Sequence, residues 1–327
     1  MIYLYFAVLI TSFAILFKCA DWFVKGASGI AEVLNVPKMI IGIVFVGMAT
    51  TAPEFFVSVM AAYLGHPEIA LGNAIGSVIC DDGIAMALAA LLAPAAILIN
   101  CRALKAVGLF LLSIDVLAYF LARNGKIGRT EGLFFILILA IYYIFIVKGH
   151  RSNFFRADQK NENLNKKERQ SIFSRKSQLK KPLLLFMGGI VGVIIISRAV
   201  VWSAVHIARF FQISEIIIGL TVVAIGTSLP EISTCITAAW KGEGEIAVGN
   251  IIGADILNIL WIIAVASIVN PIQVDVQVIN FTFPYMILVV ATMLVAMRIG
   301  CRLGKIKGMI LLALYVVYLY LTLSLFA

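Results

Sequence analysis

Long apolar stretches separated by short polar connections make up most of the chain. A membrane-spanning helix needs about 20 mostly apolar residues, and about ten stretches meet that requirement. We predict spans at 3–28, 37–63, 69–95, 102–122, 128–148, 182–207, 214–240, 246–270, 278–297 and 305–325. The pattern therefore predicts an all-α polytopic membrane protein with about ten transmembrane helices.

The composition excludes a soluble globular domain. Apolar residues make up 62% of the chain and charged residues 13%, with a mean hydropathy of +1.04, whereas soluble domains are about half apolar and a quarter charged. The first apolar stretch lacks a basic leading segment and a cleavage site, so we interpret it as a span rather than a signal peptide. The five cysteines are scattered without the spacing of a metal cage or disulfide framework, and we expect most to be small core residues.

The one long polar segment, 148–181, lies between the fifth and sixth spans and holds eleven Lys or Arg against three acidic residues. Basic connections between spans gather on the cytoplasmic side, which disfavours a nucleic-acid-binding role. We expect this loop to be cytoplasmic and both termini to lie outside the cell (inner or plasma) membrane. The predicted organisation is a five-helix unit at 1–148, a basic linker at 149–181 and a second five-helix unit at 182–327.

The two halves match each other in sequence. Residues 40–82 align with 217–259 without a gap, at an offset of 177 residues, and roughly 40% of the positions are identical. Because five is an odd number of spans, the second unit must enter the membrane upside down relative to the first. Inverted repeats are typical of secondary transporters, whose ion sites lie near the midplane where interrupted helices meet. The repeat therefore predicts transport.

A proline precedes a glutamate at equivalent places in both halves, as Pro53–Glu54 and Pro230–Glu231. Proline lacks an N–H and clashes with the carbonyl four residues earlier, which predicts kinks and freed carbonyl oxygens around 47–50 and 224–227. Freed carbonyls persist at membrane depth only where they are buried or line a cavity. A single proline kink is common in membrane helices, but two kinks at equivalent places favour a site.

Polar side chains accompany these glutamates. A carboxylate at membrane depth costs a few kcal/mol unless it is paired or hydrated, and the apolar stretches around Glu54 and Glu231 contain no Lys or Arg. Thr50 and Thr227 precede the glutamates by one helical turn and share their helix face. In the span after Glu54, polar residues recur at every fourth position, as Asn73, Ser77 and Asp81. The equivalent positions of the second half are Asn250, Ala254 and Asn258. Glycines in a small-x-x-x-small spacing permit close helix packing: Gly72, Gly76, Gly249 and Gly253.

This donor set contains carboxylate, amide, hydroxyl and main-chain oxygens without a His or Cys cluster. Oxygen donors suit Ca²⁺, Na⁺ or Mg²⁺ and disfavour zinc and copper. Two glutamates neutralise one Ca²⁺. Mg²⁺ demands near-octahedral geometry, so we expect this donor set to suit Ca²⁺ better than Mg²⁺. No nucleophile and base are arranged as in an enzyme, so we expect no enzymatic activity.

The residues that carry these features resemble the cation/calcium exchanger superfamily, in its sodium/calcium exchanger branch. The resemblance rests on "ATTAPE" with "GNAIGSVICD" in the first half and "GTSLPE" with "GNIIGADILN" in the second. It implies Ca²⁺ export against Na⁺ entry by alternating access, in a membrane-embedded monomer with no cofactor. Carried over by position, the implied ion ligands are Glu54, Glu231, Thr50, Thr227, Ser77, Asp81, Asn258 and the carbonyls of Gly47 and Ala224, with Asn73 and Asn250 supporting them.

Several departures from the family pattern leave the counter-ion open. Ala254 lacks the hydroxyl that is usual at that position, and the acid Asp81 of the first half corresponds to Asn258 in the second. Asp82 and Asp255 are further acids that either reach the site, bind ions at its rim or are protonated structural groups. The lack of a glutamate in the Gly-Asn blocks favours Na⁺ over H⁺. The alternatives are an H⁺- or K⁺-coupled antiporter and a cation channel.

Overall fold

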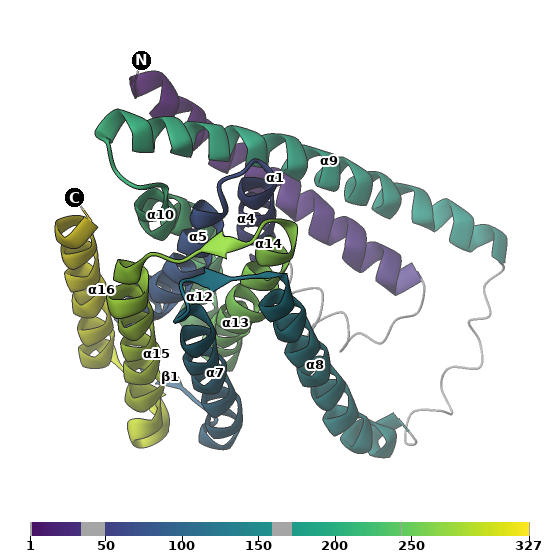
Figure 1. Cartoon of the computed structure of the whole chain (residues 1–327). Coiled ribbons are helices and arrows are strands. Elements are labelled where there is room, and N and C mark those ends of the chain that lie inside the picture. Colours follow the sequence, from purple (N-terminus) through teal and green to yellow (C-terminus); the bar gives the residue numbers. More distant parts are fainter. Residues whose placement is uncertain (1, 34–49, 159–171, 243, 327) are drawn as a thin grey trace.

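The computed structural model describes residues 2–33, 50–158, 172–242 and 244–326, and helices account for nearly all of them (Figure 1). The first half contains α1 (Ile2–Val33), α4 (Ala52–Tyr63), α5 (Pro67–Cys80), the π-helical η2 (Asp81–Ala85), α6 (Met86–Leu92), α7 (Cys101–Ala122) and α8 (Arg129–Asp158). The second half contains α9 (Ile172–Phe211), α10 (Glu215–Ile218), π-helical η3 (Gly219–Val223), α11 (Ala224–Thr227), α12 (Leu229–Trp240), α13 (Gly244–Leu257), π-helical η4 (Asn258–Ile263), α14 (Ala264–Val269), π-helical η5 (Val278–Thr282), α15 (Phe283–Arg298), the 3-10 turn η6 (Ile299–Cys301) and α16 (Lys305–Phe326).

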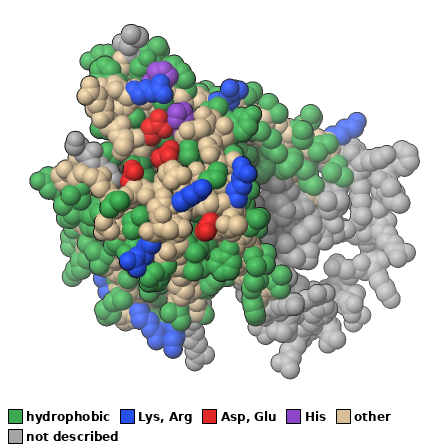
Figure 2. Space-filling model, in the orientation of Figure 1, with side chains coloured by type: hydrophobic (Ala, Val, Ile, Leu, Met, Phe, Trp, Pro, Cys, Tyr) green, Lys and Arg blue, Asp and Glu red, His purple; other side chains and the backbone are tan. Residues whose placement is uncertain are grey.

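The described helices have the length and apolar character of membrane spans. Seven of them qualify singly, and the bent pair formed by Glu215–Thr227 and Leu229–Trp240 makes an eighth. Large hydrophobic side chains cover much of the visible surface (Figure 2), as expected where lipid replaces water. These findings confirm the predicted all-α polytopic fold, while the total of ten spans and their inverted orientation stay predictions.

One predicted span lies only partly among the described residues, and the helices around the basic linker extend beyond their predicted ends. Only the second part of the expected span 37–63 lies among the described residues, as α4. Around the basic linker expected at 149–181, α8 continues to Asp158 and α9 already begins at Ile172.

Equivalent segments of the two halves adopt the same local structure. Helices α4 and α12 both have 12 residues, α5 and α13 both have 14, and each pair starts 177 residues apart. The residues that precede α4 and α12, Thr51 and Ser228, have nearly identical backbone angles, with φ of −80° and −78° and ψ of 2° and 3°. The internal repeat seen in the sequence is therefore also a repeat of backbone conformation.

Two short antiparallel ladders join the halves. Strand β1 (Ile97–Leu98) pairs with β4 (Arg302–Leu303), and β2 (Lys126–Ile127) pairs with β3 (Ile272–Gln273). Each ladder takes one strand from the first half and one from the second, so backbone hydrogen bonds tie the two units together at the ends of their helices.

The first ladder explains a departure from the expectation for the cysteines. Cys101 and Cys301 form a disulfide next to β1 and β4, across a sequence separation of 200 residues. The strand register brings these distant residues together, and spacing along the chain gives no sign of it. The expectation that most of the cysteines are small core residues holds for Cys19, Cys80 and Cys235, whose free thiols are buried, and the disulfide-bonded pair is the exception.

Helices α1 and α9 lie side by side across one face of the remaining bundle (Figure 1). Gly26 of α1 lies against the backbone of Phe186, and Gly189 of α9 lies reciprocally against the backbone of Phe23. The rings of Phe23 and Phe186 stack with centroids 5.3 Å apart. This reciprocal contact is the close packing that small residues permit between membrane helices.

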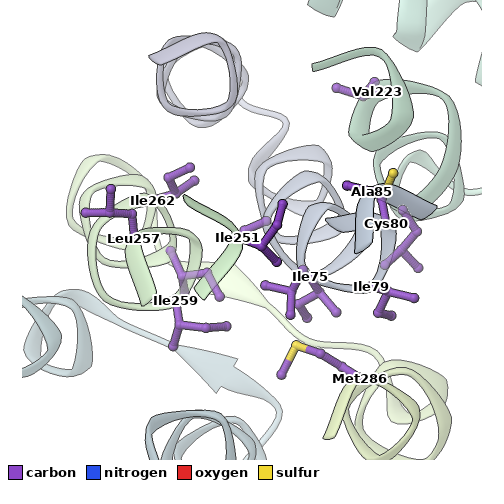
Figure 3. Close-up of a cluster of buried hydrophobic side chains, with 14 of the residues drawn as sticks. Ile75, Ile79, Cys80, Ala85, Val223, Ile251, Leu257, Ile259, Ile262 and Met286 are labelled. Carbon is purple, nitrogen blue, oxygen red and sulfur yellow. The ribbon is translucent and has the colours of Figure 1, made fainter. Parts of the chain in front are cut away.

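The core forms where helices of the two halves pack against each other (Figure 3). A Cβ atom at Gly72 would lie 2.6 Å from the carbonyl oxygen of Ile216, and one at Gly76 would lie 2.6 Å from that of Leu220. These contacts confirm the packing role predicted for the first pair of glycines. Gly249 and Gly253 have no such neighbour within 4 Å among the described residues, so their role stays a prediction.

Candidate ion-binding site

The helix that carries Glu231 is interrupted just before it. Helices α11 and α12 are bent by 44° relative to each other, with Ser228 between them and Pro230 in the first turn of α12. Proline is tolerated there because the first turn of a helix leaves its N–H groups unpaired. The predicted kink is thus confirmed in the second half. In the first half, Pro53 has the same position in α4, and the residues before Thr50 lie outside the described part of the chain.

The carbonyls expected to be freed around 224–227 differ in their hydrogen bonds. The carbonyl of Ala224 accepts the N–H of Ser228 at 3.0 Å and the hydroxyl of Thr227 at 3.3 Å, so the expectation that it is freed is wrong. Helical hydrogen bonds continue up to the N–H of Ser228. Pro230 has no N–H, so the carbonyl of Gly226, four residues earlier, lacks its helical hydrogen bond. The other expected carbonyl, that of Gly47, lies outside the described residues.

Two reciprocal hydrogen bonds connect the Pro-Glu segment of each half to the Gly-Asn helix of the other. The hydroxyl of Thr227 donates to Oδ1 of Asn73 at 3.0 Å, and that of Thr50 donates to Oδ1 of Asn250 at 3.3 Å. The two bonds join residues at equivalent positions of the repeat. They bring the segments that the alignment singled out into one place, although these are far apart in sequence.

The two asparagines differ in their remaining bonds. The Nδ2 group of Asn73 donates to Oγ of Ser58 at 2.9 Å and to the carbonyl of Glu54 at 3.3 Å. The Nδ2 group of Asn250 has no hydrogen-bond partner among the described residues. At the position equivalent to Ser58 stands Cys235, whose thiol lies against the carbonyl of Ala247 instead. The site is therefore asymmetric despite the repeat.

The glutamates of both halves converge in the interior. Glu54 and Glu231 are at most 1% exposed, and their four carboxyl oxygens have no hydrogen-bond partner among the described residues. Glu54 lies near the hydroxyls of Thr227 and Ser228, Glu231 lies near that of Thr50, and both interact electrostatically with Asp81. Buried polar groups are nearly always hydrogen-bonded, so this cluster of unpartnered carboxyl oxygens needs another explanation.

The polar side chains next to the glutamates also lack hydrogen-bond partners among the described residues. Ser77, Asp81 and Asn258 are buried, and Oγ of Ser77, Oδ1 of Asp81 and Oδ1 of Asn258 have no partner among the described residues. Every Lys and Arg side chain whose burial is described is at least partly exposed, so none of them provides a buried counter-charge. The acceptors gathered here can be satisfied by cations, by protons or by water.

The further acids form a second group beside this cluster. The carboxyl groups of Asp82 and Asp255 approach each other, although no hydrogen bond of ordinary geometry joins them. Asp115 of α7 interacts electrostatically with both, and it is fully buried with no hydrogen-bond partner among the described residues. Asp115 is not among the residues predicted from the sequence, although an acid within the apolar stretch 102–122 is a sufficient signal.

Ser228 is a second residue that the sequence analysis missed. It is buried, its Oγ has no partner among the described residues, and it lies near the carboxylate of Glu54. The signal for it is the repeat itself, because Ser228 occupies the place of Thr51 and both residues can supply a hydroxyl oxygen.

The described residues hold no group of three or more His, Cys, Asp or Glu side chains arranged to hold a metal ion. A cation at the convergence of Glu54 and Glu231 must therefore also be coordinated by hydroxyl, amide or main-chain oxygens. Mixed oxygen coordination of this kind is what Ca²⁺ and Na⁺ accept and what softer metals disfavour.

The two halves that meet at this site also match a known family. The profile of the family described as "Sodium/calcium exchanger protein" matches residues 4–148 and 181–324. The chain belongs to the sodium/calcium exchanger family. The two matched stretches correspond to the two halves, and the family lies within the cation/calcium exchanger superfamily expected from the motifs. Its members are transporters, not enzymes.

Individual relatives match over almost their full length. The putative antiporter CaxA of Alkalimonas amylolytica is 33% identical over 308 residues, which cover 93% of this chain and 94% of that protein. The sodium/calcium exchanger MaX1 of Methanosarcina acetivorans is 30% identical, with 98% of both chains covered. A solved structure of the sodium–calcium exchanger NCX_Mj, soaked with Na⁺ and Sr²⁺, superimposes with a TM-score of 0.64 at 26% identity, covering 98% of this chain and 99% of that one.

Proposed function

We propose that this protein is a secondary active antiporter that exchanges Ca²⁺ for Na⁺ by alternating access. The proposal rests on one observation above the others, the convergence of the unpartnered carboxylates of Glu54 and Glu231 from the two halves. Family membership supports it, as do relatives named as a sodium/calcium exchanger and an antiporter.

The ions would bind between the two halves, near the membrane midplane. Glu54 and Glu231 would neutralise one Ca²⁺, and the remaining ligands would be the oxygens of Thr50, Thr227, Ser77, Asp81 and Asn258 and the carbonyl of Gly47. The Gly226 carbonyl and Ser228 hydroxyl are additional candidates. Because one set of carboxylates would serve both ions, occupancy by Ca²⁺ and by Na⁺ would be mutually exclusive. The transporter would need no cofactor.

Alternating access would use the two long helices on the face of the bundle. Helices α1 and α9 pack against each other through Gly26 and Gly189, and as a pair they would slide past the helices that carry the glutamates. Such motion exposes a fixed site to either side of the membrane in turn. We propose that the protein works as a monomer of two five-helix units, 1–148 and 182–327, in the inner or plasma membrane, with the loop between them cytoplasmic and both termini outside.

The test is transport by the purified protein in liposomes. An outward Na⁺ gradient should drive uptake of ⁴⁵Ca²⁺, and Glu54→Gln or Glu231→Gln should abolish it, because the neutral amide loses the charge that balances Ca²⁺. The control is Glu245→Gln, which changes an exposed glutamate in the first turn of α13 and should leave the flux unchanged. Undiminished flux in both site variants would refute the site.

A second candidate function differs from the first in the counter-ion that drives Ca²⁺ transport. The acid Asp81 of the first half corresponds to the neutral Asn258 in the second, and Ser77 corresponds to Ala254, which has no hydroxyl, so an H⁺- or K⁺-coupled antiporter is the alternative. Gradients of Na⁺, K⁺ and H⁺ should be imposed one at a time on the same liposomes, and we expect only the Na⁺ gradient to drive Ca²⁺ uptake. Equal Ca²⁺ flux without any counter-ion gradient would identify a cation channel instead.

A further inference from the structure

A cavity of about 600 Å³ lies between α9 and the turn that joins α4 to α5. None of the candidate ion ligands lines it. Helix α9 contributes the basic side chains Arg198, His206 and Arg209 and apolar ones such as Val205 to its wall, and the turn contributes Leu64 and His66. The cavity is therefore amphipathic, and it is separate from the site where Ca²⁺ would bind.

One face of α9 carries the basic side chains. Arg198, Trp202, His206 and Arg209 follow at intervals of four, four and three residues, which places them along one side of the helix. Nδ1 of His206 donates to the carbonyl of Trp202 at 2.8 Å, and the ring of Tyr5 from α1 packs on both, with centroids 4.8 Å and 5.2 Å away. These contacts hold the aromatic part of the face in place between the two arginines.

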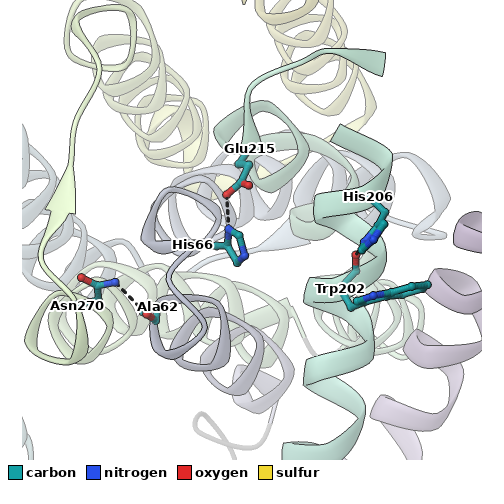
Figure 4. Close-up of polar contacts among 6 residues, drawn as sticks. All are labelled: Ala62, His66, Trp202, His206, Glu215 and Asn270. Carbon is teal, nitrogen blue, oxygen red and sulfur yellow. Dashed lines mark hydrogen bonds and ion pairs between the residues drawn. The ribbon is translucent and has the colours of Figure 1, made fainter. Parts of the chain in front are cut away.

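An acidic residue lies beside the histidine of the α4–α5 turn. Nδ1 of His66 lies 2.7 Å from Oε2 of Glu215 (Figure 4), so this histidine already has an acidic partner. Neither Arg198 nor Arg209 forms an ion pair with an acidic residue of the described chain. Basic, histidine and acidic side chains lie beside one another near the top of the molecule (Figure 2). The uncompensated charge of the cavity is thus that of the two arginines.

The position of these arginines points to the lipid phase. Arg198 lies eleven residues before Arg209, roughly 16 Å deeper along the helix, where a cation is costly unless it has a partner. Large apolar side chains of α9 are exposed next to the cavity, among them Ile195, Phe210 and Phe211, as expected of a helix that faces acyl chains. The end that carries Arg209 is predicted to lie outside, so the positive-inside rule gives no reason for a basic residue there.

We propose that this cavity binds the phosphodiester headgroup of an anionic phospholipid. Arg198 and Arg209 both line the cavity, so their long side chains would extend into it from the two ends of the basic face and hold the phosphate oxygens through the paired hydrogen bonds that guanidinium groups form with phosphate. The apolar lining residues would contact the glycerol and the beginning of the acyl chains, and Trp202 would lie at the interface as tryptophan commonly does. The bound lipid would bridge α9 and the α4–α5 turn.

The test compares short-chain probes on the full-length, delipidated protein in detergent. Dioctanoyl phosphatidylglycerol should raise the melting temperature and remain bound in native mass spectrometry, whereas dioctanoyl phosphatidylcholine and inorganic phosphate should do neither at the same concentration. The double variant Arg198→Gln/Arg209→Gln should bind phosphatidylglycerol about tenfold more weakly or worse, as expected for the loss of charge-assisted hydrogen bonds. Arg123→Gln, which changes an exposed arginine at another helix end, should bind it like the parent protein.

Three results would overturn the proposal. Equal affinity of the double variant and the parent would exclude the arginines as ligands. An equal shift with phosphatidylcholine would indicate binding through the acyl chains alone, and an equal shift with inorganic phosphate would indicate a free anion rather than a lipid. If the double variant fails to elute as a monodisperse protein, Arg209→Gln alone decides, because this exposed residue near the helix end can be changed without disturbing the bundle.

Discussion

Asn73 and Asn250 of the candidate site differ in the side chain available to accept a hydrogen bond from their amide groups. Asn73 has the Ser58 hydroxyl as an acceptor, whereas Asn250 has a cysteine in the equivalent place. A thiol is a weak acceptor and a weak donor, and that of Cys235 is turned toward Ala247 and Met86. The first-half asparagine is therefore fixed by the protein, and the second-half one is left with a donor free for water or for rearrangement.

This difference predicts unequal effects of two matched truncations. Ser58→Ala should lower the free energy of unfolding by about 1–3 kcal/mol, because it leaves the buried amide of Asn73 without its shorter bond. Cys235→Ala removes no acceptor of the Asn250 amide and should cost less. Apparent melting temperatures of the two variants in the same detergent measure the difference. Equal losses would show that the Ser58 bond contributes nothing specific.

At the scale of elements, the site depends on how closely α5 can approach η3. The contact is made by backbone, because Gly72 of α5 and Gly219 of η3 face each other and a Cβ on the latter would lie 2.8 Å from the carbonyl of Ile69. That approach places Asn73, the next residue, within hydrogen-bonding distance of Thr227. These two glycines thus set the distance across which the hydrogen bond between Thr227 and Asn73 forms.

We therefore expect Gly72→Ala to separate α5 from η3. The added methyl group would meet the backbone at Ile216, which cannot move aside as a side chain does, and overpacking of this kind costs about 1–3 kcal/mol. Gly188→Ala is the matched control, because it lies in α9 with nothing within 4 Å and should be neutral or stabilising through helix propensity. Thermal stability and ⁴⁵Ca²⁺ flux should both fall in the first variant only. An unchanged flux and melting temperature in Gly72→Ala would contradict the role of this contact.

At the scale of the whole molecule, two ladders and one disulfide join the halves. The disulfide between Cys101 and Cys301 lies at the β1–β4 end, which the charge pattern assigns to the cytoplasmic side together with the basic loop. Disulfides persist in oxidising compartments and are rare in the reducing cytoplasm. The redox state of this pair in the cell therefore reports which way the molecule is oriented.

We predict that both thiols are reduced in untreated cells and that an oxidant such as diamide joins them. Trapping free thiols with a mass-tagged maleimide before and after oxidation measures this. The variant Cys101→Ser should show no oxidant-dependent change, which identifies the pair. A disulfide already present in untreated cells would place the β1–β4 end outside and reverse the proposed orientation.

Features that depend on local pattern and on the similarity of the two halves could be predicted from the sequence. Apolar length specifies a membrane span because lipid cannot satisfy an open backbone, so the all-α polytopic fold followed from hydropathy alone. The gapless match of 40–82 with 217–259 singled out Glu54 and Glu231, and the Pro230 kink followed from a missing N–H. The family assignment could be made from the same blocks, and the comparisons confirm it.

Contacts between segments that are far apart in the chain could not be predicted from the sequence. The fold brings Thr227 to Asn73 and Thr50 to Asn250, places Asp115 beside the acids of η2 and α13, and joins Cys101 to Cys301. It also shows that, within the stretch 224–227, the carbonyl of Ala224 is hydrogen-bonded, whereas that of Gly226 lacks its helical donor because residue 230 is a proline. Periodicity reports which face of a helix a residue occupies, but which helix lies opposite that face is set by packing of the whole chain.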